Sequence, residues 1–387
     1  MQMEERTAAL LRQLPPEIDG ILCTLEAAGY EAWLAGGCVR DGLLGRPVHD
    51  WDITTAALPQ TVTALFPRTV PTGLAHGTVT VLAGDRQAEV TTFRTDGAYR
   101  DGRHPEQVQF VPCLAEDLAR RDFTVNAMAL NRAGDLVDLY GGQADLQAGL
   151  LRCVGDPDRR FGEDALRMLR VFRFSAQLGF AVEAETAAAA RRCAPRADAL
   201  SAERVRDEME KTLLSPRPQM IGEMAAAGLL RRFLPAADRA ALQRVFSREL
   251  PAEPGVRWAA LLLAAPQLDL EALRLPKKTA RTARAAVDIL EESGGDLTPV
   301  QLRRAAAAQG MDCARTAAAL CGRTPDLEQE LAAGHCMGLR DLAVNGTDFP
   351  DVHGPALGRL LQHLLDHVLE HPEDNRREVL LGLRIQD

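Results

Sequence analysis

Aromatic residues are scarce in this sequence. Phe, Tyr and Trp make up 4% of its 387 residues, whereas alanine is abundant. Sheet-rich cores depend on aromatic and β-branched side chains, so the composition argues against a β-sandwich for most of the chain and favours closely packed helices. Apolar residues still make up 46% of the sequence, which is typical of a globular protein. Because a single hydrophobic core rarely grows to this length, we expect two or more domains.

Long apolar runs are also missing. No segment approaches the roughly 20 consecutive apolar residues of a membrane-spanning helix, and residues 1–14 are charged and amphipathic. They lack the basic segment and continuous apolar stretch of a secretory signal peptide. We therefore expect a soluble protein in the cytoplasm, with no membrane partner.

Cysteine pairs and an excess of positive charge are absent as well. The eight cysteines show no CxxC spacing, so the sequence indicates neither a disulfide framework nor a structural zinc site, and we expect reduced, mostly packed thiols. The formal net charge is −9, which argues against a surface covered with phosphate-binding residues. Any binding of nucleic acid must depend on local basic patches.

The pattern of apolar residues changes along the chain. Up to about residue 150, strand-like segments at 31–37, 76–84 and 87–95 are mixed with helical ones. From about residue 161, apolar residues recur at three- and four-residue steps. We therefore predict an α/β part followed by an all-α part. The first half of segment 95–119 is rich in Gly, Asp and Arg, has no helical period, and predicts a mobile loop.

Two aspartates, Asp50 and Asp52, stand one residue apart where a strand emerges from a turn. Alternate side chains of a strand share a face, so the two carboxylates would repel each other unless a cation lay between them. An isolated DxD is also common in solvated turns. Here a predicted strand ends upstream at Gly36 and Gly37, where backbone amides can approach an anion, and Arg40 follows one turn into the next helix.

This combination is typical of nucleotidyl transfer. In that chemistry two Mg²⁺ ions clamp the attacking hydroxyl and the leaving pyrophosphate, and neighbouring carboxylates supply the hard oxygen ligands. We expect Asp50 and Asp52 to be catalytic and to bind the metal, with phosphate against Gly37 and Arg40. Glu89, on a neighbouring predicted strand, is the candidate for a third carboxylate.

A second motif, RRDFTVNAMAL, spans residues 120–130. Two arginines and an aspartate directly precede an apolar segment that should be buried. This position suits triphosphate and ribose recognition, with Arg121 as a phosphate fork and Asp122 as an acceptor for sugar hydroxyls. The alternative is a helix end that carries a surface ion pair.

A third motif, GEDALRMLRVFRF, spans residues 162–174. On a predicted helix Asp164 and Arg167 share one face, and Arg170 and Arg173 follow at successive turns. Side by side, a carboxylate accepts and a guanidinium donates, which matches a base that presents an exocyclic amino group next to an unprotonated ring nitrogen. Cytosine and adenine present that pattern, and uracil and guanine present the reverse. The alternative is an ion pair on a helix surface.

Other polar clusters are less specific. The histidines His363, His367 and His371 lie at four-residue steps, but the stripe lacks the glutamate of a zinc protease, and we expect solvated side chains on a helix. The basic segments 191–196 and 277–284 fit contacts to a nucleic-acid backbone as well as an ordinary helix surface.

The motifs, taken in order, resemble the class II CCA-adding enzymes, the bacterial tRNA nucleotidyltransferases that have a polymerase-beta-type catalytic head. The matching segments are AGGCVRDGLLGRPVHDWDITT, EVTTFRT, RRDFTVNAMA, DLYGG and GEDALRMLRVFRF. Residues 339–350, LRDLAVNGTDFP, and the segment after them resemble the C-terminal region of Gram-positive-type members. The resemblance implies an α/β head with a small mixed sheet and helices (1–150), an all-α neck that selects the nucleobase (151–218), a helical body (219–300) and a helical tail that binds tRNA (301–387).

The resemblance also implies a reaction and a set of site residues. The 3′ hydroxyl of tRNA attacks the α-phosphorus of CTP twice and then of ATP, without a template, with Mg²⁺ as the metal and pyrophosphate as the leaving group. Metal ligation falls to Asp50 and Asp52. Contacts to CTP and ATP fall to Gly37, Arg40, Arg121, Asp164, Arg167, Arg170 and Arg173.

Several related activities share these motifs. Relatives add only C, only A or poly(A), and the distinction rests partly on the loop after the EVTTFR segment. Here that loop contains Tyr99, Asp101, Arg103 and His104, which favours addition of the terminal A. A non-catalytic RNA-binding protein is the alternative from another class, and the intact Asp50 and Asp52 argue against it. The RRD and EDxxR motifs argue against an antibiotic-modifying nucleotidyltransferase, and the sequence leaves the oligomeric state open.

Overall fold

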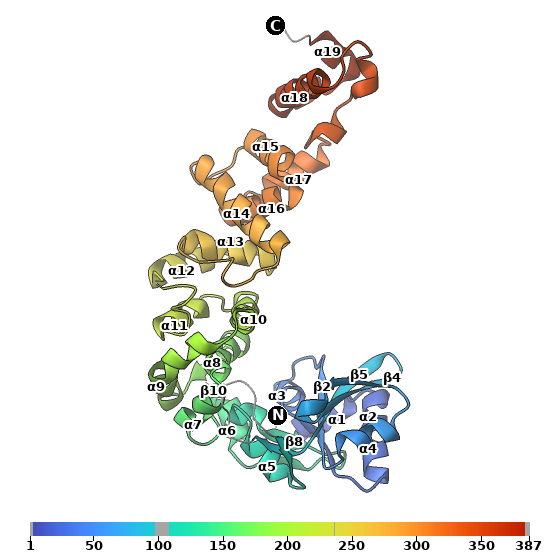
Figure 1. Cartoon of the computed structure of the whole chain (residues 1–387), viewed down its shortest axis with the longest axis vertical. Helices are drawn as coiled ribbons and strands as arrows, with labels where there is room; N and C mark the ends of the chain where they lie inside the picture. Colours follow the sequence, from blue (N-terminus) through green and yellow to red (C-terminus); the bar gives the residue numbers. More distant parts are fainter. Residues whose placement is uncertain (1–2, 97–107, 236, 384–387) are drawn as a thin grey trace. The chain divides into compact units, whose positions relative to one another are not determined.

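The computed structural model describes residues 3–96, 108–235 and 237–383 (Figure 1). They form two compact units, the first comprising Met1–Glu208 and Ala226–Leu229 and the second Met209–Ala225 and Leu230–Asp387. Within the described ranges every β-strand belongs to the first unit, and the second consists of helices and their connections. The prediction of an α/β part followed by a helical part is confirmed. The finer division at residues 150, 218 and 300 stays a prediction.

A seven-stranded mixed sheet forms the centre of the first unit, with the strand order β3-β4-β5-β2-β1-β8-β9. Strand β2 pairs with β5 in parallel, and the other neighbours are antiparallel. Side chains alternate as in a sheet with one covered face, since Ala88 and Val90 of β5 are buried and Glu89 is exposed. The strands are β1 (Ala32–Ala35), β2 (Trp51–Thr55), β3 (Thr69–Gly73), β4 (Thr78–Ala83), β5 (Arg86–Thr92), β8 (Met128–Leu130) and β9 (Leu136–Asp138).

Helix α2 (Pro16–Ala27) covers part of this sheet with one apolar face. It contacts β1, β2, β4 and β5. Its buried residues recur at three- and four-residue steps, as expected for an amphipathic helix, and are Ile18, Ile21, Leu22 and Leu25. The other helices of this region are α1 (Met3–Arg12), α3 (Gly37–Leu43), α4 (Pro59–Leu65) and the 3-10 turn η1 (Leu74–His76).

Strands β6 (Arg94–Asp96) and β7 (Val108–Phe110) form a separate antiparallel pair. The loop predicted between them lies outside the described residues, including Tyr99, Asp101, Arg103 and His104. After β7 the chain forms α5 (Leu114–Ala119) and the 3-10 turn η2 (Thr124–Asn126), which leads into β8.

The DLYGG segment starts helix α6 (Gly142–Ala148). The Asp138 carboxylate accepts hydrogen bonds from the amides of Gly142 (2.8 Å) and Gln143 (2.9 Å), which have no partner inside the helix. A Cβ at Gly142 would overlap the carbonyl oxygen of Thr124. The motif therefore needs its aspartate as a cap and glycine at this position.

Helix α8 (Leu166–Leu178) is almost entirely buried, including the charged residues Arg167 and Arg173. The prediction of a helix that carries both Asp164 and Arg167 is wrong. Helix α7 (Pro157–Glu163) ends before Asp164, whose backbone is extended (φ −139°, ψ 109°). The Asp164 carboxylate instead accepts the Leu166 amide (3.0 Å), because aspartate competes for the free amides at a helix start. The neighbouring elements are β10 (Leu150–Leu151), β11 (Ala181–Val182), α9 (Ala184–Cys193), η3 (Ala194–Ala199) and α10 (Ala202–Leu213).

The second unit has apolar cores of its own. Trp258 is fully buried, and its indole Nε1 donates to the Glu210 carboxylate (2.9 Å). Near the C-terminus Leu364 and Val368 pack with Leu380. The helices are α11 (Met220–Ala226), α12 (Arg239–Phe246), α13 (Pro254–Ala264), α14 (Lys277–Glu292), α15 (Pro299–Gln309), α16 (Met311–Cys321), α17 (Thr324–Ala332), α18 (Pro355–Glu370) and α19 (Arg377–Gly382), with short 3-10 turns at Leu339–Asp341, Gly346–Asp348 and Pro372–Asp374.

The structure also bears on the membrane-span, cysteine and histidine features noted in the sequence. Across the described ranges, no helix is both long enough and apolar enough to cross a membrane. All eight cysteines are free thiols, four of them buried, two half-buried and two exposed. In the histidine stripe, His367 Nε2 lies 2.9 Å from the Asp374 carboxylate, and its ring centroid is 5.0 Å from that of His371.

Candidate active site

A cavity of about 590 Å³ lies within the first unit, between the open face of the sheet and helix α8. Its wall contains seven of the nine predicted site residues, namely Gly37, Arg40, Asp52, Arg121, Asp164, Arg167 and Arg170. Asp50 and Arg173 are not part of this wall. Glu89, Asn126 and Phe174 also line it.

The glycine turn lets two charged side chains approach the backbone. Gly36 has a positive φ of 77° and precedes helix α3. A Cβ at this position would lie 2.7 Å from Arg121 Nη1 and 3.7 Å from Asp52 Oδ2. A larger residue at position 36 would therefore be strained and would displace the Arg121 guanidinium. Arg40 is buried and lies close to Gly37, whose added Cβ would be 3.6 Å from Arg40 Nη2.

Acidic side chains gather on the sheet side of the cavity. Asp52 of β2 pairs in register with Glu89 of the parallel strand β5, so both side chains belong to the same face. Asp50 is exposed and precedes β2. Burial, together with the negative charges of Glu89 and Asp50, raises the pKa of Asp52 to about 6, against the opposing effect of Arg121. These carboxylates are therefore held in a mutually repulsive arrangement.

Asp52 and Glu89 are the acidic side chains on this side of the cavity that could hold a metal ion. Across the described residues no three His, Cys, Asp or Glu side chains are grouped closely enough to form a metal cluster. Yet no described residue donates a hydrogen bond to the side chains of Asp52 or Glu89, whose repulsion a cation would relieve. Carboxylate oxygens are the ligands that Mg²⁺ prefers. The side chains present are compatible with a divalent metal ion.

The two arginines of the RRD motif share one buried partner, Asp117 of helix α5. Arg120 binds its Oδ1 (2.7 Å) and Arg121 binds its Oδ2 (3.2 Å). Burial alone would raise the pKa of Asp117, but the two guanidinium groups outweigh it and lower that pKa. Arg121 Nε is buried and has no hydrogen-bond partner among the described residues. Sequence reasoning missed Asp117, although its three- and four-residue spacing from the arginines was a usable signal.

The Asp122 carboxylate is used on both oxygens. Oδ1 accepts from the Phe123 amide (2.9 Å) and from Asn126 Nδ2 (3.1 Å), and Oδ2 binds Arg170 (2.6 Å). Burial would raise the pKa of Asp122, but Arg170 and Asn126 lower it to about 2. The predicted contact with a sugar hydroxyl would have to share these oxygens, and it stays a prediction.

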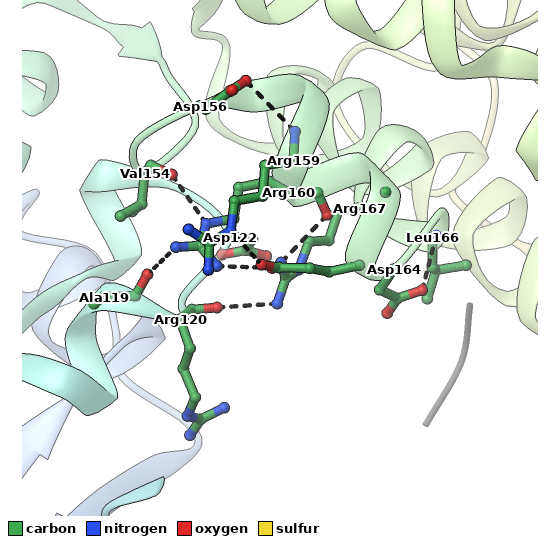
Figure 2. A network of polar contacts seen from close by, with 12 residues as sticks. Ala119, Arg120, Asp122, Val154, Asp156, Arg159, Arg160, Asp164, Leu166 and Arg167 are labelled. Atoms are coloured by element: carbon green, nitrogen blue, oxygen red, sulfur yellow. Dashed lines mark hydrogen bonds and ion pairs between the residues drawn. The ribbon is translucent and has the colours of Figure 1, made fainter. Parts of the chain in front are cut away.

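Asp164 and Arg167 are each held by a neighbour. Asp164 Oδ2 accepts from Arg204 Nη2 (2.9 Å). Arg167 Nη1 donates to the Glu163 carboxylate (2.7 Å), and Nη2 donates to the Arg120 carbonyl (2.9 Å). Figure 2 shows the contact between Arg167 and Arg120, in which the guanidinium of Arg167 reaches the backbone of the RRD motif. The base-reading pair predicted from sequence is thus positioned by other side chains.

Glu163 links two arginines to the same backbone segment. It binds Arg167 and also Arg160 (2.7 Å), which in turn donates to the carbonyls of Val154 (3.0 Å) and Ala119 (Figure 2). Glu163 is the first acidic residue of the EDxxR motif. Its role in orienting Arg167 was missed from the sequence, where Asp164 was paired with this arginine instead. The motif therefore contains one residue that fixes the arginine and one that faces the cavity.

Phe174 lies among three arginines of the site. The guanidinium carbons of Arg40, Arg170 and Arg173 are 5.1, 5.3 and 3.9 Å from its ring centroid. These distances are within the range of cation–π attraction. Arg173 itself is bonded to Glu208 (2.5 Å) and Gln177 (3.0 Å), away from the cavity wall. Its predicted nucleotide contact stays a prediction.

Comparison with known proteins identifies the family. Residues 32–152 match the poly A polymerase head domain, and residues 179–241 match a probable RNA and SrmB binding site of polymerase A. The CCA-adding enzyme of Lactiplantibacillus plantarum is 39% identical over 96% of this chain and 97% of its own length. The chain belongs to the family of CCA-adding enzymes. It is therefore a tRNA nucleotidyltransferase of that family, as the order of its motifs predicted.

Two further relatives agree with this assignment. The CCA-adding enzyme of Streptococcus gordonii is 44% identical over 73% of this chain and 73% of its own. The crystal structure of the Bacillus stearothermophilus CCA-adding enzyme in complex with CTP is 33% identical, with a TM-score of 0.81 over 95% of this chain and 97% of that one. The polymerase-beta-type head and the helical remainder are confirmed as the architecture of this family.

Proposed function

We propose that this protein adds C, C and A to the 3′ end of tRNA, using CTP and ATP and no nucleic-acid template. The observation that carries the proposal is a single cavity that combines carboxylates on β2 and β5 with arginines on α3, in the RRD motif and on α8. The relative of known structure was solved with CTP, which is the first nucleotide that this reaction requires. A cytoplasmic location stays a prediction.

The acidic side of the cavity is the proposed metal site. The CCA-adding family generally needs a divalent metal ion. We assign Asp50 and Asp52 as its ligands, with Mg²⁺ as the metal, and Glu89 as a neighbouring third carboxylate. When bound, the ion supplies Lewis acidity at the transferred phosphorus and offsets charge on the pyrophosphate. Asp52 must be ionised to serve, and its pKa of about 6 makes that form dominant near neutral pH.

The basic residues around the glycine turn are the proposed triphosphate site. Arg40 and Arg121 each present a planar guanidinium, which matches the geometry of phosphate oxygens. The buried Arg121 Nε–H has no partner among the described residues and is a candidate donor to the ligand. Gly37 leaves the backbone open beside Arg40. Preorganised donors of this kind stabilise the charge that develops on the leaving group.

Asp164 and Arg167 are the proposed readers of the incoming base. The carboxylate accepts from the exocyclic amino group of cytosine or adenine, and the guanidinium donates to the adjacent ring nitrogen. Glu163 and the Arg120 carbonyl set the orientation of Arg167 before a nucleotide arrives. Arg170 extends the basic wall along α8. Arg173 follows it on the same helix and is proposed as a further nucleotide contact, although it is bound to Glu208 outside this wall. In uracil and guanine a ring N–H would face the donating guanidinium, and a carbonyl oxygen would face the accepting carboxylate. The site would therefore reject UTP and GTP.

The chemical step follows from this arrangement. The 3′ hydroxyl of tRNA gives up its proton to solvent and its oxygen forms a bond to the α-phosphorus. The bond from that phosphorus to the oxygen that bridges to the β-phosphate breaks, and pyrophosphate leaves with that oxygen. The chain's own residues hold the triphosphate in line and exclude the wrong base. The helical tail, residues 301–387, is the proposed site of tRNA binding.

The deciding experiment uses a tRNA transcript that ends at the discriminator base. Labelled CTP and ATP are supplied with Mg²⁺, and products are resolved to single additions. We expect a ladder of C, CC and CCA that then stops. A ladder that ends at CC, incorporation of A alone, or a long A tract would replace the proposal by a CC-adding, A-adding or poly(A)-adding activity. Binding of the transcript without any incorporation would indicate a non-catalytic RNA-binding protein.

A further inference from the structure

Asn126 stands between the two basic walls of the cavity. It closes the 3-10 turn η2, it is 6% exposed, and it lines the cavity. Its side-chain oxygen accepts a hydrogen bond from Arg40 Nη1 (2.6 Å). Its side-chain nitrogen donates to Asp122 Oδ1 (3.1 Å). The same residue therefore contacts helix α3 on one side and the RRD motif on the other.

The connection continues to helix α8. The second oxygen of Asp122 binds Arg170 through Nη2 (2.6 Å) and Nε (2.8 Å). Arg40 and Arg170 also lie over one ring, that of Phe174, at 5.1 and 5.3 Å from its centroid. Two arginines from distant parts of the sequence are thus joined by a continuous chain of polar contacts, in which Asn126 and Asp122 are buried.

The chemistry of this chain suits asparagine in particular. The guanidinium of Arg40 requires an acceptor, and the carboxylate of Asp122 requires a donor. An asparagine side chain supplies both at the two ends of one rigid amide. Aspartate would place a second carboxylate against Asp122, and alanine would leave both neighbours without this partner.

We propose that Asn126 is a positioning residue that sets Arg40 and Arg170 relative to each other across the nucleotide cavity. The inference rests on the proposed function, in which Arg40 faces phosphate and Arg170 lies on the base-reading helix. Asn126 makes no choice between bases. It aligns the two arginines for every addition, so CTP and ATP depend on it equally.

The test compares three variants in the full chain. Asn126→Ala removes both contacts. Asn126→Asp keeps the shape of the side chain but replaces the nitrogen that donates to Asp122 with an oxygen that cannot donate when ionised. Asn131→Ala is the matched control, because Asn131 makes similar contacts to Asp135 (2.8 Å) in a turn between β8 and β9 that is not part of the cavity wall. Steady-state kinetics are measured for C addition to a transcript that ends at the discriminator base and for A addition to one that ends in CC.

We expect Asn126→Ala to lower kcat/KM on the order of 10²-fold for both nucleotides, mainly through kcat, because a misaligned triphosphate still binds. Asn126→Asp should lose at least as much, while Asn131→Ala stays close to the wild type. Thermal unfolding of each variant checks that the fold is kept. If Asn126→Ala does not fold, the nearly isosteric Asn126→Asp alone carries the comparison.

A double-mutant cycle separates positioning from a general structural role. Because Asn126 acts through the Asp122–Arg170 pair, the Asn126→Ala, Arg170→Ala double variant should be no slower than the slower single variant. Losses that multiply would overturn the inference, as would a wild-type kcat/KM in Asn126→Ala. A change in UTP acceptance would show a base reader instead and would also overturn it. If the wild-type protein adds neither C nor A, the proposed function fails, and the inference fails with it.

Discussion

On the sheet side of the cavity, Asp52 and Glu89 stand in register with no hydrogen-bond donor on either side chain among the described residues. On the side of helix α8, each arginine has a carboxylate partner: Glu163 for Arg167, Asp122 for Arg170 and Glu208 for Arg173. Glu89 is exposed, but Asp52 is at least partly buried, as are the three arginines, so solvent screening does not account for the contrast at Asp52. The difference lies in which charges the protein neutralises itself and which it leaves for a ligand.

The pKa values express the same contrast. Burial raises the pKa of Asp52 and of Asp122 alike, since it disfavours the charged form. Beside other carboxylates, the pKa of Asp52 remains raised at about 6, whereas Arg170 and Asn126 lower the pKa of Asp122 to about 2. A carboxylate whose pKa is raised would be stabilised by a cation, whereas one whose pKa is lowered already has a positively charged partner. The acidic side is thus built for an external charge and the α8 side for rigidity.

The largest expected effect comes from removing the unpartnered carboxylate. Asp52→Asn should lower C addition on the order of 10³-fold or more, because the main metal ligand and its charge are lost. The fold should not weaken, since like-charge repulsion is relieved. Incorporation of labelled CMP and thermal unfolding measure the two results. Asp85→Asn, an exposed aspartate in the turn between β4 and β5, is the control and should leave both unchanged.

On the α8 side, substitution of a base-reading arginine should reduce activity less than substitution of Asp52. Arg167→Ala is expected to lower kcat/KM for CTP by about 10- to 10²-fold, the worth of a charge-assisted hydrogen bond, and to weaken the discrimination against UTP. Glu163→Gln should produce a smaller loss of the same kind, because Arg167 keeps its contact with the Arg120 carbonyl. Single-nucleotide incorporation with CTP and UTP provides the ratio.

Arg159→Ala is the matched control for that experiment. Arg159 binds the same carboxylate, Glu163 (3.2 Å), but its side chain is 75% exposed and lies outside the cavity wall. It should keep the CTP to UTP ratio of the wild type. A ratio that changes as much as in Arg167→Ala would show that the ion-pair network, rather than contact with the base, sets specificity.

Stability should depend on pH with opposite signs on the two sides. The lowered pKa of Asp122 contributes roughly 2–3 kcal/mol above pH 4, and that contribution is lost as pH falls through about 2. The raised pKa of Asp52 acts in the other direction. Its contribution to the stability of the fold is present below pH 4 and is lost as pH rises through about 6. The second effect is smaller, because Asp52 is only partly shielded from solvent.

Urea unfolding without metal, between pH 2 and pH 8, checks both signs. Asp52→Asn should be more stable than the wild type at pH 8 and equal to it near pH 4. Asp122→Asn should be less stable than the wild type at pH 7, with a difference that shrinks in acid. Parallel curves for the wild type and Asp52→Asn across this range would contradict the raised pKa and with it the contrast between the two sides.

The smallest effect concerns the metal itself. Mg²⁺ at ten times its Kd should stabilise the first unit by about 1.4 kcal/mol, which corresponds to a rise in Tm of about 3–5 °C. Asp52→Asn should abolish most of this rise, and Arg167→Ala should keep it. Calorimetry with and without Mg²⁺ makes the measurement. Equal stabilisation of the wild type and Asp52→Asn would place the ion elsewhere.

Much of the architecture followed from local patterns. The change from mixed to purely helical periodicity predicted the α/β part and the helical remainder, and the ordered motifs predicted the family. Gly37, Arg40 and Arg121 were named from sequence and line one cavity. The continuous helix through Asp164 was wrong because an aspartate at this position captures the Leu166 amide and starts a new helix.

Other parts of the site depend on residues far apart in the sequence. Arg204 holds Asp164, and Glu208 holds Arg173. Periodicity gives no information about such partners, because two helices can pack in several registers with the same apolar pattern. Asn126 was visible only as a polar residue inside an apolar segment, which indicates a buried hydrogen bond but not its partner.

The sequence by itself determined the kinds of charge available to this site, since the types and spacing of acidic and basic residues are covalent facts. Only the tertiary structure decided which charges neutralise one another and which remain open to a ligand. The physical reason is that burial makes every carboxylate less favourable as an ion, and the sign of the final pKa shift depends on the neighbours that packing brings within hydrogen-bond distance. Asp52 and Asp122 are the same residue type with opposite outcomes.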